Sequence, residues 1–573
     1  GAGPARRGAR WLAAVPAATL ALFLAPVLVG LIGTLAPAFG VLPVLGGTAL
    51  SLEPWRALAA EPALPGAVRL TLVTGLGATV VALAGAIAIV AAWHDRAAFR
   101  ALRRMLAPLI ALPHAALAIG LAFALAPSGL IARAFSPWAT GWERPPDLLI
   151  VGDPAGLSLI LGLAIKELPF LLLMIVAASG QIDTGPALRM ARAAGYGPAT
   201  AWVKTVLPRL YPQIRLPVYA VLAYSLSVVD MAMILGPGTP PPLAPLILRW
   251  FADPDLAMRF TAAAGACLQL ALVIGAIGLW RLAEVAIARL ARPWLEAGGR
   301  RALEGPARAI AVVSAGGMAA GAGAAIAAVG LWSVAAVWRW PDALPAAWTL
   351  ETWIDGTRAL TGPAATTLVV GLAATALALA LVLGCLEYEQ RAGVRPTTRA
   401  LWLLYTPLLV PQIGFLFGVQ VLLLVVGLDG TMAALVWAHL LFVLPYVFLT
   451  LADPWRALDP RYARTAACLG ASPARVFWKV KLGLLLRPIA VAAAVGFAVS
   501  VAQYLPTVFA GAGRLPTLTT EAVGLAAGAD RRLVGVFAFA QAGLPMLAFA
   551  LALALPRLLR PGRRGPGGGE GAR

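Results

Sequence analysis

Lys166 and Glu167 are two charged residues in the otherwise apolar stretch 157–178. Placing a charge in so apolar a segment costs free energy, so charged residues there are candidates for a functional site. Two interpretations stay open for the pair: the charges serve a functional site, or they neutralise each other inside a helix bundle. Phe442 and Val443 stand at the corresponding positions in the second half of the chain, so the scaffold itself does not require the charges.

A second polar pair occurs twice at the same spacing. Ser227 precedes Asp230 by three residues in one apolar stretch, and Ser500 and Gln503 repeat that spacing in another. Asp230 could face a cationic solute. The alternative is a buried carboxylate that is satisfied by internal hydrogen bonds.

The residues that enzymes and metal sites need are sparse in this chain. The 3 histidines show no metal-ligand spacing, and the 3 cysteines form neither a CxxC motif nor a disulfide framework. A phosphate-binding loop needs Gly-x4-Gly-Lys-Ser/Thr, but none of the lysines follows a glycine. We therefore expect no catalytic residue, metal, cofactor or ATP site in this chain.

The composition indicates that the elements carrying these residues lie in a membrane. Of 573 residues, 61% are hydrophobic and 12% are charged, and the mean hydropathy is +0.85. A soluble domain cannot bury that much apolar surface, and intrinsic disorder is excluded as well. Twelve stretches are long enough to cross a bilayer as helices, near 11–34, 67–93, 105–126, 157–178, 214–235, 260–281, 309–336, 363–386, 401–427, 432–452, 488–509 and 533–556. They predict an all-α polytopic membrane protein.

An even number of spans places both termini on one side of the membrane. If that side is the cytoplasm, it holds 33 lysines and arginines and the opposite side holds 11, when the arginines at the span ends are counted with the adjoining loops and Lys166 is left out. This excess follows the positive-inside rule. It also explains the net charge of +20 without a nucleic-acid partner, so we expect the lipid bilayer to be the partner of the basic residues.

The two halves of the chain resemble each other. The motif Thr-Leu-Val-x-Gly-Leu-x-Ala-Thr at 71–79 recurs at 367–375, and Leu-Pro-Phe at 168–170 recurs as Leu-Pro-Tyr at 444–446. Six spans per half give the repeats the same orientation, which predicts a pseudo-two-fold axis along the membrane normal. The expected domains are an N-terminal tail, first helix and loop at 1–66, a first repeat at 67–281, a linker with the seventh helix at 282–362, a second repeat at 363–556 and a basic tail at 557–573.

The most informative segments are the cytoplasmic loops that follow the fourth span of each half. Each encodes two short helices, with a glycine where the first must stop and a proline where the second begins. The stops are Gly195 and Gly470, and the restarts are Pro198 and Pro473. Small residues on the first short helix would let its backbone approach a partner groove closely.

These loops resemble the pattern Glu-Ala-Ala-x3-Gly-x9-Ile-x-Leu-Pro of permeases in binding-protein-dependent ABC importers. The residues that match the pattern are Ala191, Gly195, Leu207 and Pro208 in the first loop, and Ala466, Gly470, Val480 and Leu482 in the second. The glutamate position instead holds Arg189 and Arg464, and Thr205 and Gly483 also depart from the pattern. In its degenerate glutamate position the chain is similar to the fused two-half permeases of the thiamine and iron(III) importer group.

The resemblance implies a type I ABC importer permease of a bacterial inner membrane. The first short helix of each loop would be a coupling helix that docks on a separate ATPase subunit, of which we expect two copies. A periplasmic binding protein would deliver the solute, and the stretches that hold Ser227 and Ser500 would lie along the central path. The solute stays open between thiamine-like cations, iron(III), polyamines and oxyanions.

A proton- or sodium-coupled secondary transporter is the alternative, because such proteins can also have twelve spans in two parallel halves. It would need charged relays inside the membrane, and this chain has few of them. A membrane enzyme would need clustered His, Asp or Cys residues at a membrane face, and the sequence shows no such cluster.

We predict that both termini are cytoplasmic. A reporter enzyme that works only in the periplasm, fused after Arg573, should therefore be inactive, while a reporter that works only in the cytoplasm should be active. Activity of the periplasmic reporter at that position would reverse the assigned orientation.

Overall fold

The structure is a computed structural model that describes residues 4–394, 406–528 and 530–559. The elements up to the linker are α1 (Pro4–Ala38), the 3-10 helix η1 (Pro43–Leu45), α2 (Glu53–Ala60), α3 (Leu64–Trp93), α4 (Ala97–Ala111), α5 (His114–Leu125), α6 (Leu130–Phe135), α7 (Leu157–Ser179), α8 (Gly185–Ala193), α9 (Pro198–Thr205), α10 (Leu207–Ser227), α11 (Asp230–Leu235), α12 (Leu243–Phe251) and α13 (Met258–Leu290). The linker and second half contain α14 (Arg292–Glu296), α15 (Glu304–Ser333), α16 (Glu351–Ala392), α18 (Ile413–Val425), α19 (Met432–Arg456), α20 (Pro460–Cys468), α21 (Pro473–Arg475), the π-helix η2 (Val476–Lys481), α22 (Leu482–Leu484), α23 (Leu486–Val501), α24 (Leu505–Gly511), α25 (Leu518–Ala526) and α26 (Arg531–Leu559). Two short antiparallel strands, β1 (Ala335–Val337) and β2 (Ala347–Trp348), lie between α15 and α16.

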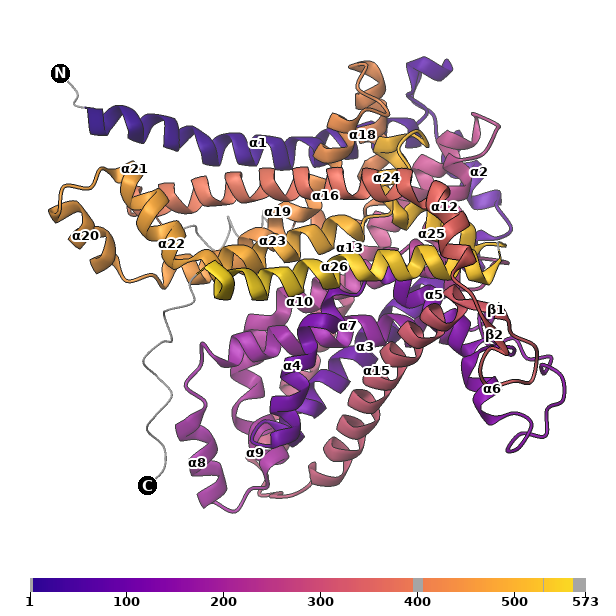
Figure 1. The fold of residues 1–573 in the computed structure, drawn as a ribbon, viewed down its shortest axis with the longest axis horizontal. Coiled ribbons are helices and arrows are strands. Elements are labelled where there is room, and N and C mark those ends of the chain that lie inside the picture. The colour runs from indigo at the N-terminus through magenta and orange to yellow at the C-terminus, as the bar shows by residue number, and fades with distance from the viewer. Residues whose placement is uncertain (1–3, 395–405, 529, 560–573) are drawn as a thin grey trace.

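The helices confirm an all-α polytopic membrane protein (Figure 1). Within the described residues, 9 helices are long and apolar enough to cross a bilayer, and a pair bent by 76°, Pro473–Leu484 with Leu486–Val501, would make 10. These 9 candidates are α1, α3, α7, α13, α15, α16, α19 and α26, together with one span that α5 and α6 form jointly.

Four of the twelve expected spans are interrupted or shortened in the structure. One of them, 488–509, is divided between α23 and α24. The stretch 214–235 is divided between α10 and α11, because the backbone leaves the helix at Val228. The stretch 401–427 contributes α18, and its first residues lie outside the described part of the chain. In the stretch 105–126, the spanning helix begins only at His114, the start of α5. The preceding helix α4 cannot continue into it, because Pro113 has no backbone N–H to donate. The structure thus supports nine or ten of the expected spans.

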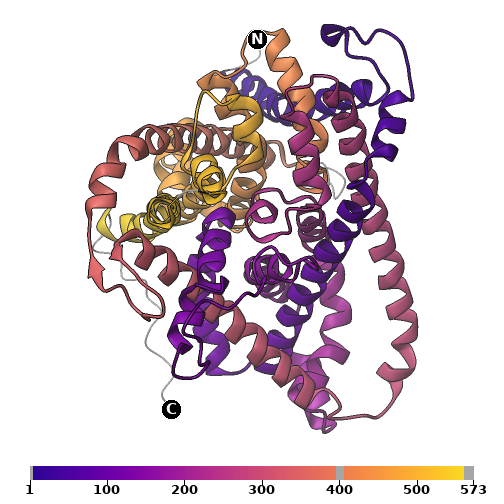
Figure 2. The same cartoon turned by 90° about the vertical axis from the view of Figure 1, so that its right-hand side faces the viewer.

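The first helix of each half packs against the opposite half. Figure 2 shows the helices of the first half (violet to magenta) beside those of the second half (orange to yellow). α1 lies along α16 and α18, and α15 lies along α3 and α5. Small residues permit the first contact, because a Cβ on Gly418 would overlap the backbone of Gly30. The two halves are therefore interlocked.

The repeated threonine motif makes the same contact in both halves. The Thr71 hydroxyl accepts the backbone N–H of Leu243 at 2.8 Å, at the start of α12. The Thr367 hydroxyl accepts the N–H of Leu518 at 2.9 Å, at the start of α25. Each contact satisfies one of the N–H groups that a helix start leaves free. The motif therefore holds the start of a short helix in the same way in each half.

The contact between α1 and α18 provides a test of the interlocked fold. We expect Gly418→Val to push the two helices apart and lower the melting temperature of the detergent-solubilised chain, since overpacking typically costs roughly 1–3 kcal/mol. Gly317→Val is the matched control, because a Cβ there meets no described atom within 4 Å. Equal melting temperatures for the two variants would contradict the contact.

Candidate coupling loops and buried polar site

The two loops end their first helix with the same backbone motif. After α8, the Gly195 N–H donates to the carbonyl three residues back at 2.9 Å, and the next N–H donates five residues back at 3.0 Å. After α20, Gly470 and its successor repeat both bonds at 2.9 and 3.0 Å. Both glycines have a φ of 82°, the left-handed conformation that favours glycine. The two stops are thus equivalent, and both loops lie on the left-hand side of the molecule in Figure 1.

The first loop is held by the linker of its own chain. The Glu304 carboxylate accepts two backbone N–H groups at the start of α9, at 3.1 and 3.4 Å, and the hydroxyl of Thr200 at 3.2 Å. The Lys204 ammonium near the end of α9 donates to the carbonyls of Trp294 at 2.8 Å and Ala297 at 2.6 Å. These contacts fix α9 at both of its ends.

Arg192 ties the first short helix to the end of α3. Its guanidinium forms an ion pair with Asp95 and lies 3.3 Å from Nε2 of His94. Burial lowers the pKa of His94 below its ordinary value, so the ring is neutral near pH 7 and can accept a hydrogen bond. Ala191 is buried on this helix, whereas Arg189 is exposed. α8 is therefore packed on its own chain on one face and open on the other.

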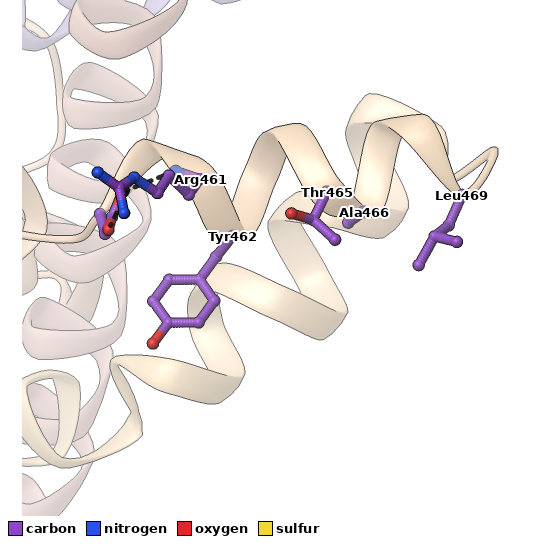
Figure 3. Close-up of a pocket in the computed structure, with 6 residues that line it drawn as sticks. Arg461, Tyr462, Thr465, Ala466 and Leu469 are labelled. Atoms are coloured by element: carbon purple, nitrogen blue, oxygen red, sulfur yellow. Dashed lines mark hydrogen bonds and ion pairs between the residues drawn. The ribbon is translucent and has the colours of Figure 1, made fainter.

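The second short helix projects much more freely. Every residue of α20 is exposed or half-buried, and these include Arg464 and Ala466. Tyr462 and Leu469, with exposed fractions of 54% and 83%, border an open hollow of about 500 Å³ (Figure 3). The apolar side chains on this face of α20 are therefore open to solvent.

A buried ion pair anchors the second loop to the end of α16. Nζ of Lys481 lies 2.6 Å from the Glu387 carboxylate, which also pairs with Arg391 at 2.6 Å. The remaining residues of the sequence pattern lie where each loop re-enters the bundle: Leu207 and Pro208 at the start of α10, and Val480 and Leu482 on either side of Lys481.

The Lys166 side chain caps the C-terminal end of α4, which lies inside the helix bundle. Its ammonium donates to the carbonyls of Ile110 and Leu112, at 2.9 and 2.5 Å. These carbonyls belong to the end of α4, where Pro113 separates it from α5. Helix ends leave carbonyls without partners, and lipid supplies none. Lys166 therefore has a local structural role.

Glu167 lies beside His114, the first residue of α5, and Asp230 is within electrostatic range of the same ring. The Glu167 carboxylate lies 3.4 Å from Nε2 of His114. Asp230, the first residue of α11, interacts electrostatically with His114 and with Lys166. The His114 ring packs against Tyr224 with 4.8 Å between the ring centroids. The structure therefore gathers three of the predicted polar residues into one buried cluster.

In the second half, the polar residues at the helix break form hydrogen bonds with one another and with the backbone. His439 bridges the hydroxyls of Ser500 at 2.8 Å and Thr507 at 2.9 Å, across the break between α23 and α24. The Gln503 amide at this break donates to a carbonyl of α23 at 3.2 Å. At the corresponding break in the first half, the Ser227 hydroxyl donates to a carbonyl of α10 at 2.7 Å. Both recurring polar pairs thus stand at helix breaks.

A scan against models of known protein families finds no match for this chain. A search of characterised proteins finds the inner membrane ABC transporter permease protein YnjC of Escherichia coli strain K12, which is 35% identical over 508 residues. The match covers 88% of this chain and 90% of the relative. This chain belongs to the ABC transporter permease family. Membership favours that transport class over a secondary transporter, whereas the likeness to the thiamine and iron(III) group stays a prediction.

The permease depends on residues that the sequence patterns did not single out. Glu304 acts on Thr200, 104 residues away, so no local motif could reveal it. Glu387 carries a weak signal, since Arg391 follows it at the helical spacing of an ion pair. Within the part of the permease that the structure describes, no group of three His, Cys, Asp or Glu residues could hold a metal ion.

In the permease, Glu304→Gln should loosen the start of α9 while it keeps the shape of the side chain. A helix N-cap contributes about 1 kcal/mol, so opening of this turn should become roughly fivefold more frequent. Hydrogen exchange of the Thr200 backbone N–H measures that opening. Glu296→Gln, at an exposed glutamate of the same linker, is the control. Unchanged exchange in the Glu304 variant would show that the linker does not hold the loop.

Proposed function

We propose that this permease is the membrane subunit of an ABC importer. It forms the path for a small solute that a periplasmic binding protein delivers, and a separate ATPase subunit drives the cycle. The observation that carries the proposal is the pair of equivalent loops, each with a left-handed glycine that ends its first helix. Two matched docking elements on one side of one chain suit two copies of the ATPase.

α8 and α20 are the coupling helices in this proposal. α20 offers the larger free surface, where Tyr462, Ala466 and Leu469 border the open hollow (Figure 3). α8 offers Met190, which is 74% exposed, next to the exposed Arg189. Closure of the ATPase pair would push both helices and move the halves between inward- and outward-facing states.

The proposed path runs between the halves at their helix breaks. Discontinuous helices often carry the solute sites of transporters, because their free ends can bind a ligand. The hydroxyl of Tyr504, beside the second-half break, lies 3.7 Å from the sulfur of Met233 in the first half. This contact brings the two breaks together. The residues that we place along this path are Ser227, Asp230, Ser500, Gln503, Lys166 and Glu167.

The coupling loops belong to the cytoplasmic side of a bacterial inner membrane in this proposal. α1 begins and α26 ends on the same side as α8 and α20 (Figure 1). The excess of lysine and arginine in the segments on that side supports the same orientation.

Gly470→Asp tests the coupling role directly. A Cβ in the left-handed conformation costs about 1 kcal/mol, which should leave the protein inserted and expressed. A charge on the docking surface should cost more, because burial of an unpaired charge is strongly unfavourable. We therefore expect weaker co-purification of the ATPase and loss of transport.

Two further variants complete this test. Gly195→Asp should act in the same way but less completely, because Arg300 lies 3.5 Å from a Cβ at that position and would pair with the new charge. Gly427→Asp, in the loop between α18 and α19, is the matched control, since its φ of 72° imposes the same strain away from the coupling helices. Wild-type ATPase binding and transport in both coupling variants would overturn the proposed role.

A further inference from the structure

Four arginines lie on one face of α4, the helix that follows α3. Arg100 precedes Arg103 by three residues and Arg104 by four, so these residues share one side of the helix. Arg96, at the N-cap, extends the set one turn earlier. All four residues are exposed. They form the arginine row, a strip of positive charge that is about two helical turns long.

The opposite face of α4 is apolar and attaches the helix to the bundle. Phe99, Leu102 and Leu106 are buried, and they follow the same spacing of three and four residues. They belong to one apolar cluster with Leu172 of α7 and Trp202 of α9. The arginine row therefore faces away from the protein.

Among the described residues, no carboxylate pairs with the arginine row. Asp95, the acidic residue next to the row in sequence, forms its ion pair with Arg192 of α8 instead. Elsewhere in the chain, Arg215, Arg391 and Arg456 each pair with a glutamate. Four guanidinium groups without a counter-charge therefore favour an anion that comes from outside the chain.

The depth of the arginine row suits the headgroups of a bilayer. The far end of α4 lies inside the bundle, where the Ile110 carbonyl accepts a hydrogen bond from the Lys166 ammonium at 2.9 Å. Lys166 lies near the middle of α7, which is one of the candidate spans. At 1.5 Å per residue, Arg104 and Arg96 are about 9 and 21 Å from Ile110 along the helix axis. Half of the hydrocarbon core is about 15 Å thick, so the row lies close to its edge.

Apolar residues follow the arginine row toward the interior of the bilayer. Met105 is 47% exposed, and Pro108 is exposed four residues after Arg104 on the same side of α4. A phospholipid presents its groups in this order, with the charged headgroup outside and the acyl chain inside. A docking surface for a soluble protein would not need to continue as an apolar strip at membrane depth. The order of groups along α4 therefore favours a lipid over the ATPase.

We propose that the arginine row binds the phosphate of an anionic phospholipid, whose acyl chain lies against Met105 and Pro108. Guanidinium groups match phosphate oxygens with paired hydrogen bonds and stay charged at physiological pH. The lipid must carry a net negative charge, because a zwitterionic headgroup brings a cation of its own to a site that already holds four. The inference needs only the membrane class of this chain, so it does not depend on the proposed importer cycle.

Native mass spectrometry tests this inference on the permease released from nanodiscs of equal parts phosphatidylglycerol and phosphatidylcholine. The wild-type chain should retain phosphatidylglycerol in preference to phosphatidylcholine. A triple variant with Arg100→Gln, Arg103→Gln and Arg104→Gln should lower the retained ratio of the two lipids by about fivefold or more, because each arginine near the bilayer surface adds to the attraction of anionic headgroups.

Two matched triple variants serve as controls. Lysine at the same three positions keeps the charge and should keep the preference for phosphatidylglycerol. Arg289→Gln, Arg301→Gln and Arg358→Gln together remove three charges from exposed arginines in three separate segments of the chain. This second control should leave the lipid ratio as it is in the wild type, because its arginines share no helix face.

A photoreactive benzoylphenylalanine in place of the half-exposed Met105 gives a second measurement with every arginine intact. In the same nanodiscs it should cross-link to phosphatidylglycerol more often than to phosphatidylcholine. This measurement decides the matter even if the triple glutamine variant fails to fold.

The inference is overturned if the wild type retains the two lipids equally, if position 105 cross-links to them equally, or if the triple glutamine variant keeps the wild-type ratio. Weaker co-purification of the ATPase by that variant, with an unchanged lipid ratio, would assign the arginine row to a protein interface instead. The coupling tests at Gly195 and Gly470 measure a different property, so their failure would leave the lipid result standing.

Discussion

Several helices of this permease end inside the helix bundle, and the rest of the structure depends on how the backbone groups at those ends find hydrogen-bond partners. Each stop frees backbone N–H and C=O groups that lipid cannot satisfy, so side chains must do so. Lys166 serves two carbonyls at the end of α4, and His439 links α19 to both sides of the break between α23 and α24. One half uses the Lys166 ammonium for this task, whereas in the other the Thr507 hydroxyl donates to the Gln503 carbonyl at 3.0 Å and His439 holds that hydroxyl in place. Two similar halves thereby acquire different chemistry where they meet.

The exchange of first helices makes the two halves one mechanical unit. α1 packs on the second half and α15 on the first, so neither half can turn without a helix of the other. Close backbone contact at Gly30 and Gly418 leaves little room for the helices to slide apart. If α8 and α20 are coupling helices, as we propose, a push on either one would therefore reach both halves and the helix breaks at their boundary.

The two proposed coupling loops are supported unequally, and the fused chain explains why. A linker between halves exists once, so only one loop can rest on it. Glu304 and the carbonyls around Trp294 hold the first loop, whereas the second is anchored to α16 by Glu387 and leaves α20 open. A preorganised docking element loses less conformational freedom on binding than a mobile one. In the proposed importer, the two ATPase copies would therefore bind two sites that share a backbone conformation but differ in how firmly the rest of the chain holds them.

The sequence by itself determined the membrane class, the repeat and the two loops, because these follow from local demands. A bilayer requires apolar length, and a left-handed helix stop requires a residue such as Gly195 or Gly470. Tertiary structure alone decided what Lys166 does, since its carbonyl partners lie 54 and 56 residues away. It also decided that Glu304 supports the first loop and that Tyr504 of the second half lies 3.7 Å from Met233 of the first. Such contacts join distant parts of the chain, and no local periodicity encodes which helices will meet.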